Sequence, residues 1–389
     1  MKKNNEYCFG LIGWNGKKNV GDNAMTSVII NYIKQHYPNS KFKLLSDRNN
    51  LAHYTQDISC EVSGYAGYDA LHRVPYIRRL LRRCLFLRRF VKQSDVILIG
   101  GGSIFHRMHS SYWHREVAIM KKKQNANAIV GAIGVSLGPF NNQKEINECE
   151  KALNAFDFVT LRDAKSFSFI NEMNISTSAI RALDLAILLP DMISYNAENN
   201  YAGSLNAIGV ALRHEKVSKE HLNYLAHCFN LMMANYANMQ LFLFIFCRDK
   251  YVGDHDITNE LHQRIEDKTR VKIIDYSENP LLFYKIISTC KLMISMRLHA
   301  AIIAYTVGTP FVMLSYAEKC ISFAHEIGLR PDHIFEMDSL VSSTLDARLE
   351  NCLESDQLTV KPWSLSLSAA KSRSLNNFAF LNRCLLDEI

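Results

Sequence analysis

Short apolar runs alternate with helical periodicities along most of this chain, and that alternation constrains the fold more than any other feature. The first case is an apolar run at residues 7–12, a glycine-containing loop, apolar residues at helical spacing over 24–36, and a second predicted strand at 41–45. We expect Asp22 or Asn23 to cap that helix. A β–loop–α–β order of this kind predicts parallel strands joined by crossover helices.

The alternation continues in two series, and 389 residues are more than one ordinary hydrophobic core holds. A second β/α series begins near residue 206, after a polar stretch (189–203) that we interpret as a linker. The sequence therefore predicts two α/β domains, residues 1–195 and 196–365. Residues 366–389 form a predicted helical tail that packs back on the first domain.

Composition limits the function classes. Apolar residues make up 48% of the chain, no apolar run approaches the roughly 20 residues of a membrane-spanning helix, and the first residues lack a signal-peptide core. Ten scattered cysteines contain no C-x-x-C pair, which argues against a structural zinc site. We therefore expect a soluble, cytoplasmic protein.

The net charge of +7 is concentrated in one segment. Eight Lys and Arg residues and no acid lie between Ala70 and Ser94, and the rest of the chain is close to neutral. This distribution argues against a nucleic-acid-binding surface. Residues 76–92 have the spacing of an amphipathic helix with an arginine-rich face. That face is either a solvated surface or a peripheral contact with anionic membrane or a lipid-linked acceptor.

One strand-to-helix corner carries the residues best suited to chemistry. An apolar run ends at Ile294, and Arg297, Leu298 and His299 follow at the start of a predicted helix. Carboxyl ends of parallel strands bind ligands, and a helix N-terminus favours anions. Arg297 supplies a fork of donors for carboxylate or phosphate, and histidine exchanges protons near neutral pH. This corner predicts an enzyme that handles a small anionic substrate.

Glycines mark a second candidate region. The loop before residue 24 matches neither the G-x-G-x-x-G fingerprint nor a P-loop. Gly100, Gly101, Gly102 and Ser103 follow a buried run, so the backbone can approach a neighbour or ligand closely. His106, His109 and His114 do not have metal-ligand spacing, and we interpret them as candidate lining of an acceptor cleft.

Taken in order, these motifs resemble the polysaccharide pyruvyl transferase family. The matching residues are Asn15, Asn19, Gly21 and Asp22; the glycine run; Arg162, Asp163 and Ser166; Arg213; and Arg297 to His299 with Gly308 to Pro310 and Tyr316 to Lys319. The resemblance implies two Rossmann-like domains facing across a cleft (GT-B-like), with the first domain on the acceptor side. It also implies transfer of pyruvyl from phosphoenolpyruvate to two sugar hydroxyls, forming a ketal and releasing phosphate.

The resemblance also implies roles for individual residues. His299 and Arg297 would be catalytic, and no metal or further cofactor is expected. The residues expected to bind the donor or the sugar acceptor are Arg213, Leu298, Lys319, Asn19, Gly21, Asp22, Gly101, Gly102 and Ser103.

Two other functions fit the same pattern. A sugar-nucleotide-dependent glycosyltransferase would use an acidic residue of the second domain to hold the ribose, with Asp249, Asp254 and Glu278 as candidates. A non-catalytic glycan-binding or scaffold protein would need neither Arg297 nor His299.

Overall fold

The computed structural model describes residues 6–13, 17–47, 60–65, 87–105, 108–193, 206–250, 252–354 and 361–386. The chain forms two compact units. Unit 1 comprises Met1–Lys17, Asp22–Ile193 and Lys371–Ile389, and unit 2 comprises Lys18–Gly21 and Ser194–Ala370. Unit 2 therefore includes four residues from near the start of the chain.

Unit 1 is built on a seven-stranded parallel sheet with the order β3-β2-β1-β4-β5-β6-β7. This Rossmann-type order reverses direction between β1 and β4, where ligands bind in open α/β sheets. The strands are β1 Cys8–Ile12, β2 Lys41–Asp47, β3 Cys60–Tyr65, β4 Val96–Phe105, β5 Ile129–Leu137, β6 Phe158–Leu161 and β7 Ser178–Arg181.

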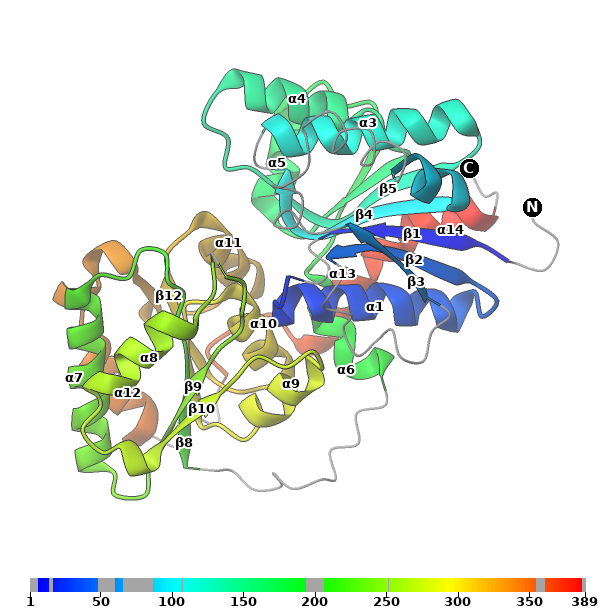
Figure 1. Ribbon diagram of the computed structural model, residues 1–389. Helices are drawn as coiled ribbons and strands as arrows, with labels where there is room; N and C mark the ends of the chain where they lie inside the picture. The colour runs from blue at the N-terminus through cyan, green and yellow to red at the C-terminus, as the bar shows by residue number, and fades with distance from the viewer. Residues whose placement is uncertain are drawn as a thin grey trace, which may run out of the picture. The chain divides into compact units, whose positions relative to one another are not determined.

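Helices cover both faces of this sheet, with α1 on one face and α3 and α4 on the other (Figure 1). Strands β4, β5 and β6 are buried along nearly their whole length, as expected for a sheet covered on both sides. The helices of unit 1 are residues 87–93, α3 Met108–Gln124, α4 Gln143–Leu153, α5 Ala164–Glu172, α6 Leu189–Met192 and α14 Ala379–Leu386. Helices α1 Val20–His36 and α13 Leu367–Leu375 begin in unit 2 and end in unit 1.

Unit 2 repeats the same architecture with six strands in the order β10-β9-β8-β11-β12-β13, all parallel. Its reversal point lies between β8 and β11. The strands are β8 Ala207–Ala211, β9 Gln240–Phe244, β10 Val271–Ile274, β11 Leu292–Ser295, β12 Phe311–Ser315 and β13 Ile334–Glu336. Two parallel-sheet α/β units confirm the predicted fold class.

Two helical layers enclose this second sheet. Helices α7, α8 and α12 pack together on one face, and α9, α10 and α11 pack on the other (Figure 1). Their bounds are α7 Lys219–Asn235, α8 His255–Arg264, α9 Leu281–Ile287, α10 Leu298–Val307, α11 Glu318–Ile327 and α12 Leu345–Glu354. Helix α10 is buried almost all round, because it is rich in small and apolar residues and crosses between two buried strands.

Several boundaries differ from the sequence-based predictions. Helix α1 begins at Val20, so Asp22 lies within its first turn and Asn23 just after it, and neither caps it. Strand β4 continues through the glycine run to Phe105, with a register shift after Gly102, whereas we expected a strand that ends at the glycines. The predicted linker also starts too early, because Leu189–Met192 is helical and buried at Leu189.

The end of the chain packs on unit 1. Phe378 stacks on Tyr32 of α1 with ring centroids 3.6 Å apart. The Asn377 side chain accepts from the Thr160 hydroxyl at 2.7 Å and donates to the Leu183 carbonyl at 2.8 Å. These contacts fill the space beside β6 and explain why a polar residue is fully buried there.

Within the described part of the chain, no helix combines the length and apolarity needed to cross a membrane. Most of the predicted basic helix, residues 76–86, lies outside the described residues. Its last part is helical over residues 87–93, with Leu87, Phe90 and Val91 buried and Arg88 and Arg89 exposed. That portion has the two faces expected of an amphipathic helix.

Candidate functional site

The predicted arginine–histidine corner lies at the reversal point of the second sheet. Arg213 follows β8, and Arg297 follows β11, and these two strands are hydrogen-bonded neighbours. Their carboxyl ends therefore lie at the same edge of the sheet. This is the position at which open α/β sheets bind ligands, so the sequence placed both arginines correctly relative to the fold.

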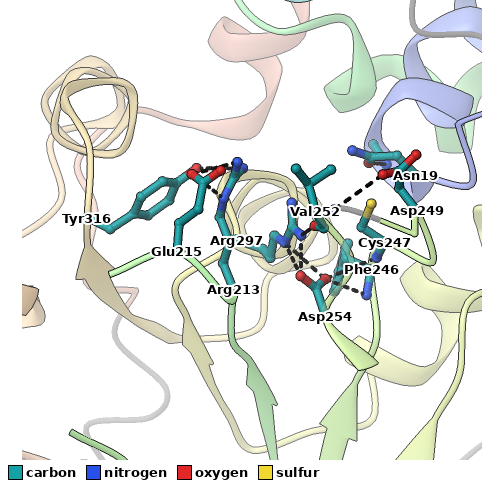
Figure 2. Close-up of polar contacts among 11 residues, drawn as sticks. Asn19, Arg213, Glu215, Phe246, Cys247, Asp249, Val252, Asp254, Arg297 and Tyr316 are labelled. Carbon is teal, nitrogen blue, oxygen red and sulfur yellow. Dashed lines mark hydrogen bonds and ion pairs between the residues drawn. The ribbon is translucent and has the colours of Figure 1, made fainter. Parts of the chain in front are cut away.

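Arg297 is held by a buried carboxylate that sequence reasoning did not single out. Its Nε lies 2.9 Å from both oxygens of Asp254, its Nη2 also contacts Asp254, and Nη2 donates to the Val252 carbonyl at 3.1 Å (Figure 2). The side chains are 8% and 0% exposed. Asp254 thus fixes the plane of the guanidinium.

The surroundings of Asp254 support an ionised carboxylate. Burial raises the pKa of Asp254, and the Arg297 guanidinium and the Cys247 N–H oppose that rise. Its Oδ2 accepts from the backbone N–H groups of Phe246 and Cys247 at 3.2 and 3.0 Å. A buried charge with four such donors is compensated, and the pair is an ion pair within the core of unit 2.

Residues 18–21, which we call the strap, pack against the loop that carries Asp254. Asn19 forms an antiparallel bridge with Cys247, the Val20 N–H donates to the Phe246 carbonyl at 3.0 Å, and the Arg248 N–H donates to the Lys18 carbonyl at 2.9 Å. The Asn19 side chain accepts from the Gly21 N–H at 3.0 Å and shapes the turn. The strap therefore belongs to unit 2, not to an acceptor-binding first domain.

The strap also reaches His299. A Cβ placed on Gly21 would lie 1.9 Å from His299 Nδ1 and 2.2 Å from its Cγ. Only a residue without a side chain leaves room for the imidazole in this position. A glycine is thus needed at position 21 because a larger residue would clash with a candidate catalytic side chain. Glycines are more often needed for an unusual backbone conformation.

Arg213 forms the other half of the site. Its Nη1 donates to the Tyr316 hydroxyl at 3.0 Å, and its Nε and Nη2 contact Glu215 Oε2 at 3.1 and 2.8 Å (Figure 2). The Lys319 ammonium lies 5.4 Å from the centroid of the Tyr316 ring. Although burial raises the pKa of Glu215, Arg213, Lys319 and Arg297 lower it overall. The site therefore already stabilises one carboxylate.

Leu298 is a predicted site residue with a buried, apolar side chain that has no group to bond an anion. It is buried in the core beside β11, at the first position of α10. Its backbone N–H is one of the unpaired groups at the start of that helix, so any contact of Leu298 with an anion would be through the main chain.

The remaining predicted residues gather in unit 1, at its own reversal point between β1 and β4. Gly101 and Gly102 have φ of +80° and +100°, which favours glycine. A Cβ on Gly102 would lie 3.7 Å from Asp22 Oδ1, and one on Gly101 would lie 3.5 Å from Met25. The structure thus brings Asp22 and the glycines together within unit 1.

Ser103 is tied to a buried polar network beneath the glycines. Arg162 Nη2 donates to the Ser103 hydroxyl at 3.3 Å, Nη1 pairs with Asp184 at 2.8 Å, and Nε donates to Ser136 at 2.7 Å. Asp163 accepts from the Ser136 hydroxyl at 2.7 Å and caps α5. The Arg162–Asp163 motif therefore braces the ends of three strands.

Of the three clustered histidines, only the His114 side chain lies among the described residues. His106 and the side chain of His109 lie outside the described residues. His114 is buried against Phe105 and Trp113, with ring centroids 5.2 and 5.0 Å away, and it does not line an acceptor surface. Among the described residues, no group of three His, Cys, Asp or Glu side chains is placed to hold a metal.

Burial makes His114 a source of acid sensitivity. Desolvation lowers its pKa from 6.5 to about 4, so the unfolded chain binds a proton at higher pH than the folded protein does. The free energy of unfolding should therefore fall as the pH drops from about 6.5 to 4, by up to about 3 kcal/mol from this residue. Urea titrations at several pH values would measure this fall in the free energy of unfolding. His114→Phe should flatten that slope, and an unchanged slope would contradict the assignment.

Comparison with known proteins agrees with this architecture. Residues 19–318 match the model of a family described as polysaccharide pyruvyl transferase. The chain is 24% identical over 291 residues to the amylovoran biosynthesis protein AmsJ of Erwinia amylovora, covering 69% of this chain and 68% of that protein.

Solved structures share the fold at low identity. A putative UDP-N-acetylglucosamine 2-epimerase from Listeria monocytogenes aligns with a TM-score of 0.61 at 11% identity, over 97% of each chain. The lipopolysaccharide outer core galactosyltransferase WaaB aligns with a TM-score of 0.52 at 10% identity, over 98% of this chain and all of that one. These likenesses show a GT-B-like fold. Since the family model spans most of the chain and both halves of the candidate site, this chain belongs to the polysaccharide pyruvyl transferase family.

Proposed function

We propose that the protein transfers a pyruvyl group from phosphoenolpyruvate to two hydroxyls of a sugar, in a cell-surface polysaccharide or its lipid-linked precursor. The observation that carries the proposal is the meeting of Arg213 and Arg297 at adjacent strand ends, with His299 at the start of α10. Family membership and the likeness to a protein named for amylovoran biosynthesis support the choice of reaction.

The donor has the charge that these residues suit. Phosphoenolpyruvate carries a carboxylate and a phosphate, and guanidinium groups bind both kinds of oxygen with paired hydrogen bonds. Arg213, Arg297 and Lys319 supply three positive charges; the buried Asp254 neutralises that of Arg297, and the half-exposed Glu215 pairs with Arg213. The start of α10 adds N–H groups that favour an anion.

His299 would move the protons. It protonates the methylene carbon of phosphoenolpyruvate, which becomes a methyl group and leaves an oxocarbenium-like carbon. One sugar hydroxyl attacks that carbon and loses its proton to the now neutral imidazole. A second hydroxyl then displaces phosphate, its proton passes to the departing phosphate oxygen, and two C–O bonds complete the ketal. A single histidine can serve as acid and then as base in such a sequence.

A product assay tests the proposal. The full-length protein is incubated with phosphoenolpyruvate and a panel of sugar and lipid-linked sugar acceptors. We expect phosphate release to require an acceptor, and the product mass to increase by pyruvate less one water. If phosphoenolpyruvate binds but no acceptor gains pyruvyl, the proposed reaction is wrong. The arginines would then serve another anionic donor.

Filling the space at Gly21 should disturb His299 without touching the donor-binding arginines. We expect Gly21→Ala to lower kcat by on the order of 10²-fold, because the added Cβ would displace the imidazole by about an ångström or more. Initial rates at saturating donor measure the effect. The control is Lys18→Gly in the same strap, where the exposed Lys18 has φ of +51°, a conformation that glycine adopts freely. Equal rates in the two variants would contradict a positioning role for Gly21.

The glycosyltransferase alternative loses one of its candidate residues. Asp254 is fully buried and both of its carboxylate oxygens are taken up by Arg297 and backbone N–H groups. It therefore does not offer an oxygen to a ribose hydroxyl. Nothing in the geometry of the described residues favours sugar-nucleotide chemistry over pyruvyl transfer.

We also propose that the protein acts in the cytoplasm and that its basic segment, residues 76–92, contacts anionic lipid or the diphosphate of a lipid-linked acceptor. Support comes from its seven Lys and Arg residues in the sequence and from the exposed Arg88 and Arg89. Polybasic segments bind anionic membranes through such clusters.

A further inference from the structure

Tyr316 is the residue of the site whose chemistry the family pattern leaves without a role. It directly follows β12, the strand beside β11, so it shares the sheet edge with Arg297. The side chain is only 8% exposed, and burial raises its pKa to about 12. Its phenol is therefore neutral at physiological pH and keeps its proton.

Two cations flank the ring. The Arg213 guanidinium lies 5.1 Å from the ring centroid, and the Lys319 ammonium lies 5.4 Å from it. Aromatic faces attract cations at these distances. The ring therefore lies beside two positive charges, and one of them, Arg213, also bonds its hydroxyl.

The hydrogen bond with Arg213 fixes the direction of the hydroxyl proton. A guanidinium has donors and no acceptor, so Arg213 must donate and the Tyr316 oxygen must accept. The phenol proton then points elsewhere. No residue that the structure describes accepts it, although the bond with Arg213 is partly buried. A partly buried O–H that has no acceptor among the described residues is available to a ligand.

The neighbourhood favours an anion as that ligand. The Glu215 carboxylate already bonds to Arg213, and Lys319 and Arg297 also lower its pKa. Glu215 is 51% exposed, so its carboxylate can exchange with a bound anion at little cost. The oxygens of a ligand beside Arg213 would come next to the Tyr316 hydroxyl (Figure 2).

We propose that Tyr316 is a substrate-binding residue that donates its hydroxyl proton to a carboxylate or phosphate oxygen of the anion held by Arg213. The identity of that anion as phosphoenolpyruvate rests on the proposed function. The same contact would hold Arg213 in place, so Tyr316 would act both directly and through its neighbour.

Calorimetric titration of the full-length protein tests this. Inorganic phosphate, pyruvate and phosphoenolpyruvate are titrated separately into wild type and Tyr316→Phe, which keeps the ring and removes the hydroxyl. We expect phosphoenolpyruvate, and one of the two smaller anions, to bind about 10-fold more weakly to Tyr316→Phe. The smaller anion whose affinity falls identifies whether the hydroxyl contacts the phosphate or the carboxylate of phosphoenolpyruvate. Unchanged affinity for all three would overturn the proposal.

Two further variants separate direct contact from positioning. Tyr305→Phe is the matched control, because the Tyr305 hydroxyl donates to the carbonyls of Leu365 and Ser366, and it should leave anion affinity unchanged. In an Arg213→Ala background, Tyr316→Phe should still weaken binding. If it has no further effect there, Tyr316 only positions Arg213, and direct donation is wrong.

The outcome is independent of the reaction catalysed. If Tyr316→Phe weakens phosphate or pyruvate binding and yet no sugar gains pyruvyl from phosphoenolpyruvate, the proposed function fails and the Tyr316 contact stands. If transfer occurs and Tyr316→Phe binds all three anions normally, the proposed function stands and the Tyr316 contact fails.

Discussion

His299→Gln should lower kcat for pyruvyl transfer by about 10²–10⁴-fold, the contribution usual for a positioned acid–base group. Glutamine occupies similar space beside Gly21 and retains hydrogen bonding, but it cannot exchange a proton near neutral pH. Because Arg213 and Arg297 are unchanged, phosphoenolpyruvate affinity should remain within a few-fold of wild type. Steady-state rates and calorimetry on the same preparation measure both quantities.

A second histidine provides the control for this variant. His325 lies in the last turn of α11 and is exposed, and His325→Gln should leave kcat unchanged. If His299→Gln retains wild-type kcat, the imidazole is not the proton carrier. If it loses donor affinity by as much as kcat, His299 serves in binding.

Asp254→Asn should destabilise unit 2 by about 3–5 kcal/mol, because it leaves the buried Arg297 without its counter-charge. The amide of asparagine also has only one acceptor oxygen, where Asp254 now accepts from two backbone N–H groups and the guanidinium. Denaturant unfolding measures the loss. Donor affinity should fall with it, because the guanidinium is no longer fixed in one plane.

An exposed pair serves as the control for Asp254→Asn. Arg248 and Asp275 also form a two-point contact, but their side chains are well exposed, and Asp275→Asn should cost no more than about 1 kcal/mol. The double variant Asp254→Leu with Arg297→Met should recover stability without activity, since apolar pairs replace buried ion pairs at little cost. Equal losses in Asp254→Asn and Asp275→Asn would show that burial of the first pair contributes nothing.

Local patterns in the sequence predicted parallel strands in two series and the ends of β8 and β11, but not the end of β4. The apolar runs that end at residues 12, 99 and 294 became parallel strands, because continuous hydrophobic runs suit strands covered by helices on both faces. Arg213 and Arg297 were placed correctly because a charged residue that directly follows a buried strand must lie at the sheet edge. The adjacency of β8 and β11 then brought the two together.

Contacts between distant residues could not be predicted in the same way. Asp254 was one of three acidic candidates, and no periodicity indicates that it pairs with Arg297, 43 positions away. The strap was assigned to the first domain because its neighbours in sequence lie there. The strap contacts Cys247 through backbone pairing at Asn19, and it packs against His299 because Gly21 has no side chain.

The contacts of the strap with unit 2 have a consequence for the order in which parts of the protein fold. The hydrogen bond from Val20 to Phe246 joins positions more than 200 residues apart, and such contacts form only after the intervening chain has been ordered. During synthesis the strap leaves the ribosome long before β9 and its following loop exist, while N-terminal structure forms first. Residues 194–370 alone would have both arginines and His299 but would lack the backbone that packs against the imidazole. The candidate active site is therefore completed only when the two ends of a long stretch of chain meet, late in folding.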